Sequence, residues 1–371
     1  MSSETISFDD SYWMSQAIEE SRKGVFLAPP NPAVGCVIVL NGRELSRGYT
    51  QRPGGNHAEI EAIEHAHAKG LSVKGATVYV TLEPCSHTGR TPPCALRLIQ
   101  EKVACVVVAT TDPNPLVSGR GVRMLREAGI EVREGICEAS AVEANIGFIT
   151  RMRRGTPFVR LKIASSLDGR TSLVNGQSQW ITCEAARADG RKLRAYAQGV
   201  LTGVGTVLTD DPQMNVRGDV CYPSPAKFVM DSYARTPVTA KILQGKPCTI
   251  FVGPHADSSA LDALRQAGAH IECLSMDKSG RLDLHEALIR IAQSGVNTLH
   301  VEAGARLNGA LIQAGLVDEM VMYMAPCLMG DGAAVAGLPK YTKMAQVQRW
   351  ELVEMSRIGD DIRLRLRKKL S

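Results

Sequence analysis

Two consecutive stretches decide the fold of the first half of the chain: NHAEIEAIEHAHAKG (residues 56–70) and ATVYVTLEPCSHTGRTPPC (residues 76–94). The first is typical of a helix that opens at His57. The second begins as an apolar strand, ends at Pro84–Cys85, and leads to Cys94 at the start of the next expected helix. Because strand ends and helix starts can meet at one edge of an α/β sheet, His57, Cys85 and Cys94 are candidates for a single site.

These three residue types indicate a zinc site. Zinc prefers histidine nitrogen and cysteine sulfur, and a catalytic zinc takes three protein ligands and leaves its fourth position to water. Glu59 need not be a ligand, since beside a zinc-bound water a carboxylate can take a proton and pass it on. A lone His-x-Glu is mostly chance, so the prediction depends on the joint pattern. His65 and His67 lie further along the same helix and are interpreted as part of its solvated face.

Length and composition predict two domains. The 371 residues exceed what one core usually holds, and the basic stretch RMRRGTPF (151–158) is a plausible linker, so we expect domains at 1–152 and 153–371. A net charge of +5 is weak for a nucleic-acid binder. The ten cysteines form no small disulfide framework, and no apolar run is long enough to cross a membrane. A cytoplasmic protein with free thiols is expected.

Both halves alternate strand and helix patterns, which predicts α/β domains. In the first half, AVGCVIVLNGRELSRGYT (33–50) predicts two strands joined by an Asn41–Gly42 turn. In the second half the expected strands run from FVRLKIASS (158–166), through candidates such as GVLTGVG (199–205), to DIRLRLRKK (361–369). The stretch VEAGARLNGALI (301–312) predicts a strand that leads through Ala303–Gly304 into a helix, where backbone N–H groups can bind phosphate. A plain strand-to-helix turn is the alternative, and no G-x-G-x-x-G fingerprint follows any strand.

The first half resembles the zinc nucleobase deaminases, whose pattern is H-x-E…P-C-x-x-C. Eight residues separate Cys85 from Cys94, where that pattern has two. The insert SHTGRTPP (86–93) and the segment PNPAVGCVIV (30–39) resemble the riboflavin-biosynthesis branch, the diaminohydroxyphosphoribosylaminopyrimidine deaminases. The resemblance implies a three-layer cytidine-deaminase-like domain over roughly residues 9–150.

The same resemblance implies the chemistry of the first half. One zinc ion per chain would be held by His57, Cys85 and Cys94. A zinc-bound hydroxide would replace the 2-amino group of a phosphoribosylaminopyrimidinone, with Glu59 carrying the proton to the departing ammonia. Asn31 matches a substrate contact of the family. We also consider Arg90 a candidate contact for the substrate phosphate, with a surface arginine as the alternative.

The second half resembles the reductase domain that this branch fuses to the deaminase, which is similar in fold to dihydrofolate reductase. The resemblance implies that NADPH delivers hydride to the sugar and turns a ribosylamino into a ribitylamino group. The residues at NADPH-contacting positions are Ala164, Trp180, Thr206, Asp210, Ser232, Gly304, Ala305, Arg306, Leu307, Asn308, Gly309 and Ala310. Those at substrate-contacting positions are Ser178, Arg194, Met214, Arg217 and Glu302.

Three points stay open. Lys162 and Asp168 are candidate proton donors of the reductase, with ordinary salt bridges as the alternative. A deaminase of nucleic-acid bases would share the motif core but needs a basic binding face. A zinc-clipped binding protein would need a fourth ligand, for which His87 is the nearby candidate. A homo-oligomer that binds a small phosphoribosyl pyrimidine, and neither nucleic acid nor membrane, is expected.

Overall fold

The computed structural model describes residues 9–86, 92–114, 118–216 and 223–369. The chain forms two compact units, Met1–Gly155 and Thr156–Ser371. The boundary falls inside the expected linker, but the basic part of that stretch is helical, since Arg151–Arg154 close helix α6 (Ile146–Arg154). Gly155, with a φ of 71°, ends the helix, because glycine adopts this left-handed conformation at little cost.

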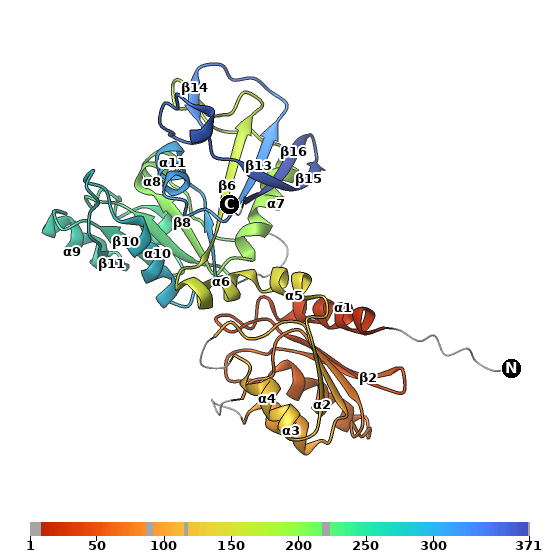
Figure 1. Cartoon of the computed structure of the whole chain (residues 1–371). Helices are drawn as coiled ribbons and strands as arrows, with labels where there is room; N and C mark the ends of the chain where they lie inside the picture. The colour runs from red at the N-terminus through yellow and green to blue at the C-terminus, as the bar shows by residue number, and fades with distance from the viewer. Residues whose placement is uncertain (1–8, 87–91, 115–117, 217–222, 370–371) are drawn as a thin grey trace. The chain divides into compact units, whose positions relative to one another are not determined.

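The first unit is built on a five-stranded sheet in the order β2-β1-β3-β4-β5 (Figure 1). Its strands are β1 (Gly35–Leu40), β2 (Arg43–Tyr49), β3 (Thr77–Val80), β4 (Cys105–Val108) and β5 (Glu131–Glu134). β1 is antiparallel to both neighbours, whereas β3, β4 and β5 are parallel. The predicted β1–β2 hairpin turns at Asn41–Gly42, where both residues have positive φ, as a tight hairpin turn requires.

Helices cover both faces of this sheet and make three layers. One face packs against α1 (Asp10–Ser21) and α5 (Glu138–Ala144), and the other against α2 (Ala58–Ala68), α3 (Cys94–Gln100) and α4 (Arg120–Glu127). The alternation along β1 decides the faces: Cys36 and Ile38 join the α2 core, and Val37 and Val39 join the α1 core. A 3₁₀ turn, η1 (Arg22–Gly24), follows α1.

Helix α2 lies directly on the β-hairpin because Gly48 of β2 has no side chain. A Cβ atom at Gly48 would be 2.5 Å from the carbonyl oxygen of Ala58 and 2.5 Å from the amide nitrogen of Ala62. Ser46, two residues earlier on the same strand, donates a hydrogen bond to the carbonyl of Ala62 at 2.7 Å. This close approach fixes the first turn of α2, where His57 and Glu59 lie.

The second unit contains a nine-stranded sheet in the order β11-β10-β9-β8-β12-β6-β13-β16-β15 (Figure 1). In chain order its strands are β6 (Phe158–Ser166), β8 (Gly199–Gly203), β9 (Ala226–Met230), β10 (Cys248–Val252), β11 (Ala269–Cys273), β12 (Thr298–Val301), β13 (Glu319–Ala325), β15 (Trp350–Ile358) and β16 (Asp361–Lys368). All pairs from β11 to β13 are parallel, and β16 and β15 are added antiparallel. A separate two-stranded sheet pairs β7 (Arg170–Leu173) with β14 (Gly332–Ala334).

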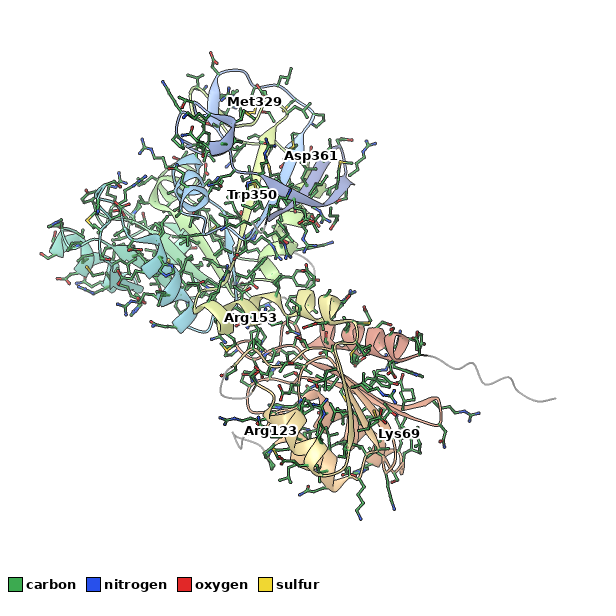
Figure 2. The ribbon with its side chains drawn as sticks, viewed as in Figure 1. Lys69, Arg123, Arg153, Met329, Trp350 and Asp361 are labelled. Carbon is green, nitrogen blue, oxygen red and sulfur yellow. The ribbon has the colours of Figure 1, made fainter. Side chains whose placement is uncertain are left out.

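The helices of the second unit are α7 (Glu184–Ala195), α8 (Val204–Asp210), α9 (Ser258–Gln266), α10 (Leu284–Gln293) and α11 (Ala305–Gln313), with 3₁₀ turns η2 (Lys241–Leu243) and η3 (Met344–Gln346). Helix α7 begins where Asp361, at the start of β16, accepts the backbone N–H of Cys183 at 2.8 Å (Figure 2). No helix among the described residues has the length and apolar character needed to span a membrane.

Two elements of the second unit differ from the sequence prediction. The run GVLTGVG was expected to be strand throughout, but β8 ends at Gly203 and helix α8 begins at Val204. Valine and threonine favour strands, and none of the helix's own side chains caps it, so packing of Val204 and Val207 on the core decides its conformation. Strand β15 was not predicted, because its exposed face and its pairing with β16 follow only from the tertiary structure.

A buried carboxylate joins the antiparallel strands to the parallel part of this sheet. Glu319 of β13 is fully buried and accepts hydrogen bonds from Arg160 of β6 at 2.5 Å and from Arg365 and Arg367 of β16 at 2.6 and 2.7 Å. Burial opposes its ionisation, but the three guanidinium groups outweigh burial and lower its pKa from 4.5 to about 2. The ionised carboxylate thus links its own strand, β13, to both neighbouring strands, β6 and β16.

We expect Glu319→Gln to lower the free energy of unfolding by about 3 kcal/mol at neutral pH, because it removes the buried negative charge that three partly buried guanidinium groups share. A depressed pKa stabilises the fold above the unfolded value of 4.5, and this stability is lost as the pH falls toward about 2. Urea denaturation at several pH values measures both effects. Glu351→Gln, an exposed position on β15, is the control, and equal stability of the two variants would contradict the prediction.

Candidate functional site

The three predicted zinc ligands of the first unit lie together. His57 is the N-cap residue of α2, Cys85 follows the end of β3, and Cys94 is the first residue of α3. Their donor atoms all lie within 4.8 Å of one another. Sγ of Cys85 and Sγ of Cys94 are 3.6 and 3.3 Å from Nδ1 of His57. The set of one imidazole nitrogen and two sulfurs is that of a three-ligand zinc site.

The electrostatics of this cluster suit a divalent cation. The hydrogen bond with the Cys94 thiol, helped by His57 and by the backbone N–H of Cys94, lowers the pKa of Cys85 to about 4. The neighbouring Cys85 sulfur raises the pKa of Cys94. Two thiols this close compete for ionisation, and a dication between them favours the thiolate form of both.

Glu59 lies in the first turn of α2, next to this cluster. Its side chain is buried, and burial, followed by the charge of Cys85, raises the pKa of the carboxyl group to about 7. A carboxyl group with a pKa near neutrality can both accept and donate a proton, which is what general acid–base catalysis requires. The catalytic role of Glu59 stays a prediction.

Glu83 is a residue whose role was not predicted from the sequence. Its buried carboxylate accepts four backbone N–H groups: Oε1 from Gly121 at 2.9 Å and Val122 at 3.3 Å, and Oε2 from Gly119 at 2.9 Å and Asp112 at 3.2 Å. The N-cap of α4 has no side-chain hydrogen bond of its own, so Glu83 caps this helix from another segment.

The hydrogen bonds of Glu83 hold the segment that carries Cys85 against the start of α4. The next residue, Pro84, lies so close to α4 that a Cβ atom at Gly121 would be 1.9 Å from its carbonyl oxygen. Both residues before Cys85 are thus held against the start of α4. The only sequence signal for this role was the position of Glu83, two residues before the predicted ligand Cys85. The N–H groups that Glu83 accepts belong to residues 112–122, and only the fold brings them next to its carboxylate.

The remaining predictions for this unit have mixed outcomes. Asn31 is half-buried in the loop before β1, and its N–H donates to the carbonyl of Ala28 at 2.9 Å, so its substrate role stays a prediction. His65 and His67 lie on the outer face of α2, where they approach Glu61 at 3.3 Å and Glu101 at 3.2 Å. His87 and Arg90 lie outside the described residues.

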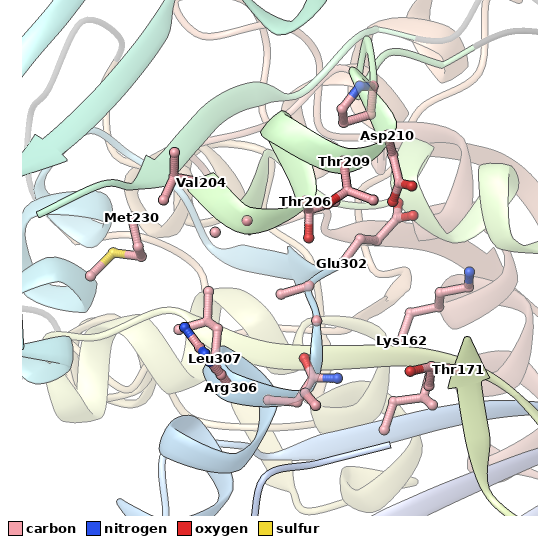
Figure 3. Close-up of a pocket in the computed structure, with 18 of the residues that line it drawn as sticks. Lys162, Thr171, Val204, Thr206, Thr209, Asp210, Met230, Glu302, Arg306 and Leu307 are labelled. Atoms are coloured by element: carbon pink, nitrogen blue, oxygen red, sulfur yellow. The ribbon is translucent and has the colours of Figure 1, made fainter. Parts of the chain in front are cut away.

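In the second unit the predicted contacts gather around one cavity of about 2020 Å³ (Figure 3). The cavity opens at the ends of β6, β8, β9 and β12 and at the starts of α8 and α11. The predicted residues that line it are Ala164, Ser178, Trp180, Arg194, Thr206, Asp210, Met214, Ser232, Glu302, Gly304, Ala305, Arg306, Leu307, Asn308 and Ala310. Segments spread over more than 140 positions therefore contribute to a single site.

One predicted NADPH contact, Gly309, is not part of the cavity wall. Gly309 is buried in α11, and a Cβ atom there would be 2.3 Å from the carbonyl oxygen of Gly337, so this glycine allows the helix to pack closely against another segment. The predicted substrate contact Arg217 lies outside the described residues. The sequence did not distinguish the cavity-lining Gly304 from the packing Gly309, because both glycines occur in the same short strand-to-helix stretch.

The two candidate proton donors have different surroundings. Asp168 is exposed and accepts hydrogen bonds from Ser166 and from the backbone N–H groups of Met329 and Gly330 (Figure 2), which lower its pKa to about 2. It does not line the cavity, so it is a loop-holding residue. Lys162 lines the cavity and forms no ion pair with any described residue, and burial lowers its pKa. The salt-bridge alternative is therefore wrong for Lys162.

Figure 3 shows Lys162 and Glu302 on the same side of the cavity, on the neighbouring strands β6 and just beyond β12. Glu302 pairs with Arg194 of α7, whose Nε and Nη2 lie 2.8 and 2.7 Å from Oε1. Burial opposes ionisation of Glu302, but Arg194 leads the neighbouring charges that outweigh burial and hold its pKa well below the usual value. The cavity thus offers an ionised carboxylate and a half-buried amine next to each other.

Together, these features define a two-domain protein with a zinc-deaminase-type site in one unit and a large nucleotide-sized cavity in the other. The model of the cytidine and deoxycytidylate deaminase zinc-binding region matches residues 7–110, and the model of the RibD C-terminal domain matches residues 157–364. The riboflavin biosynthesis protein RibD of Escherichia coli is 42% identical over 371 residues, which is 96% of this chain and 99% of that protein.

Solved structures agree with these matches over nearly the whole chain. RibD of Acinetobacter baumannii (form 1) has a TM-score of 0.88 and 42% identity and covers 97% of this chain and 99% of its own. A diaminohydroxyphosphoribosylaminopyrimidine deaminase/5-amino-6-(5-phosphoribosylamino)uracil reductase of Thermotoga maritima has a TM-score of 0.86 and 30% identity, with the same coverage.

The chain belongs to the RibD family of bifunctional riboflavin biosynthesis proteins, with a zinc-binding deaminase domain followed by a reductase domain. The predicted fold class, a deaminase-like α/β domain followed by a reductase domain, is confirmed. The prediction of an enzyme with both activities is confirmed as well.

We expect Glu83→Ala to weaken zinc binding by about 10- to 100-fold, the range typical of residues that orient metal ligands. The loss of the carboxylate leaves four backbone N–H groups without their acceptor and releases the segment that carries Cys85. Competition with a zinc chelator measures the affinity. Glu127→Ala, an exposed position at the other end of α4, is the matched control, and unchanged zinc affinity in Glu83→Ala would show that the hydrogen bonds of Glu83 do not matter.

Proposed function

We propose that the first unit deaminates a diaminohydroxyphosphoribosylaminopyrimidine and that the second unit reduces the resulting 5-amino-6-(5-phosphoribosylamino)uracil with NADPH. Both substrates are those in the printed name of the Thermotoga maritima relative. The observation that carries the proposal is the buried Glu59 beside the convergent His57, Cys85 and Cys94, in a chain that also holds the large cavity. A deaminase of nucleic-acid bases and a zinc-clipped binding protein are both disfavoured by membership of the RibD family.

In the deaminase, His57, Cys85 and Cys94 would hold one zinc ion. When bound, zinc supplies Lewis acidity that allows a water molecule to lose a proton near neutral pH. Glu59 accepts this proton and passes it to the amino group, which leaves as ammonia while the ring carbon gains the water oxygen. The raised pKa of Glu59 suits a group that must first accept and then donate. Asn31 is a proposed substrate contact.

In the reductase, the start of α11 is the proposed site of the NADPH pyrophosphate. Gly304 is the N-cap residue of this helix, no side chain caps it, and its first N–H groups border the cavity. The further NADPH contacts that we propose among the cavity residues are Ala164, Trp180, Thr206, Asp210 and Ser232. When bound, NADPH supplies the hydride. The chain's own contribution is to place the sugar against it.

The sugar-phosphate substrate would lie at the Lys162 end of the cavity. Glu302 accepts hydrogen bonds from sugar hydroxyls, and Ser178, Arg194 and Met214 line the same cavity. Hydride addition to the anomeric carbon breaks its bond to the ring oxygen, which then needs a proton. We propose Lys162 as the donor, because it is half-buried, faces the cavity and has a lowered pKa. A cytoplasmic location and a homo-oligomeric state stay predictions.

Glu59→Gln should reduce ammonia release from the pyrimidine substrate by at least about 100-fold, because the amide cannot carry the proton. Zinc content, measured by metal analysis, and the NADPH-dependent reductase rate should stay at the wild-type level. Glu64→Gln, an exposed position on the same helix, should keep full deaminase activity. Removal of zinc by a chelator should stop ammonia release and spare the reductase. Full deaminase activity in Glu59→Gln would overturn the assignment.

Lys162→Met should lower the rate of NADPH oxidation with the aminouracil substrate by about 100-fold, the typical contribution of a positioned proton donor. The methionine keeps the length of the side chain, so the dissociation constant of NADPH, measured by fluorescence, should stay unchanged. Lys192→Met, an exposed position on α7, is the control. A wild-type rate in Lys162→Met would exclude this lysine as the donor.

A further inference from the structure

A buried histidine lies behind the carboxylate of the reductase cavity. His300 is on β12, two residues before Glu302, so both side chains project from the same face of the sheet. His300 has no exposed surface, and its Nε2 lies 3.4 Å from Oε1 of Glu302. Neither ring nitrogen forms a hydrogen bond within the described part of the chain. The carboxylate that Nε2 approaches belongs to the proposed substrate site.

The contacts of Glu302 are all on one of its two oxygens. Oε1 is reached by Nε and Nη2 of Arg194 and by Nε2 of His300. No hydrogen bond from a described residue reaches Oε2, and Glu302 lines the cavity. Arg194 is itself held by the backbone carbonyl of Asn215 at 2.5 Å. One oxygen is thus held by the protein and the other remains available as an acceptor.

The surroundings of His300 keep its imidazole neutral. Its cross-strand neighbours are Val200 on β8 and Arg160 on β6. Burial lowers the pKa of His300, Arg160 and Arg194 lower it further, and Glu302 acts in the opposite direction. A neutral imidazole carries one N–H, and with that proton on Nε2 it points its donor toward the carboxylate without adding charge.

We infer that His300 is a positioning residue of the reductase site: its Nε2 lies 3.4 Å from the carboxylate oxygen that Arg194 binds, and this buried polar contact helps to keep the other oxygen of Glu302 directed to the hydroxyl groups of the sugar-phosphate substrate. The inference rests on the proposed function, because that function places the sugar at Glu302. His300 does not itself line the cavity, so its effect on the substrate would pass through Glu302.

Stability alone does not account for a histidine at this position. Leu299 and Val301, its neighbours on β12, belong to the apolar core. A buried polar side chain whose nitrogens lack hydrogen bonds is less stable than an apolar side chain of similar size. An apolar residue at position 300 should therefore leave the fold as stable or make it more stable. Weaker substrate binding without a loss of stability would therefore distinguish a role of His300 in substrate binding from a purely structural role.

The test compares His300→Leu with His300→Gln in the full-length protein. His300→Leu should raise the KM for the aminouracil substrate by about tenfold, because the buried carboxylate of Glu302 loses a polar neighbour. The dissociation constant of NADPH should stay unchanged, and the melting temperature and the deaminase rate should not fall below wild type. Gln places an amide N–H near the position of Nε2, so His300→Gln should restore the KM to within about threefold.

Unchanged KM in His300→Leu would overturn the inference. Equal impairment of both variants, or a lower melting temperature in step with the loss of activity, would also overturn it, because either result indicates a purely structural role. Glu302→Gln separates this inference from the proposed function. If Glu302→Gln binds the aminouracil normally, the assignment of Glu302 fails. If Glu302→Gln is impaired and His300→Leu is not, only the role of His300 fails.

Discussion

The deaminase site depends on one constraint: a strand end and two helix starts must meet at the same edge of the first sheet. His57 caps α2, Cys85 follows β3 and Cys94 opens α3, and their donor atoms converge to within 4.8 Å. Two close approaches hold this arrangement. Gly48 lets α2 lie on the hairpin, and the Glu83 carboxylate ties the Cys85 segment to the start of α4. The metal site is therefore a product of packing as much as of its ligands.

In the reductase unit, one face of the central strands carries ionisable side chains inside the protein, and most of them are paired with an opposite charge. Glu319 is shared among three arginines, and Glu302 is paired with Arg194. A buried charge is tolerated only where it is paired and hydrogen-bonded. Lys162 borders the cavity without an ion pair among the described residues, and its Nζ lies over the ring of Tyr323, 6.0 Å from the centroid. An amine without an ion pair at such a place suits proton transfer better than it suits stability.

Much of the fold was predictable, because its elements have local signals. The Asn41–Gly42 hairpin, the helix that opens at His57 and the strand FVRLKIASS all follow from turn chemistry or hydrophobic periodicity. Helix α8 and strand β15 were not predicted, because neighbouring segments decide their conformation. The zinc triad was predictable from spacing and donor type. Glu83 and His300 were not, because their partners lie in other segments or depend on which way a strand residue faces.

By itself, the sequence determined the two-domain organisation, the three candidate metal ligands and the resemblance to a riboflavin-biosynthesis deaminase fused to a reductase. These conclusions rest on residue types and their spacing along the chain, which can be read without knowing how the side chains pack. Only the tertiary structure decided that Asp168 holds a loop while Lys162 faces the cavity, and that Gly309 packs against Gly337 while Gly304 borders the cavity. The physical reason is that burial, pKa and hydrogen-bond partners are properties of neighbours in space, which the order of residues along the chain does not specify.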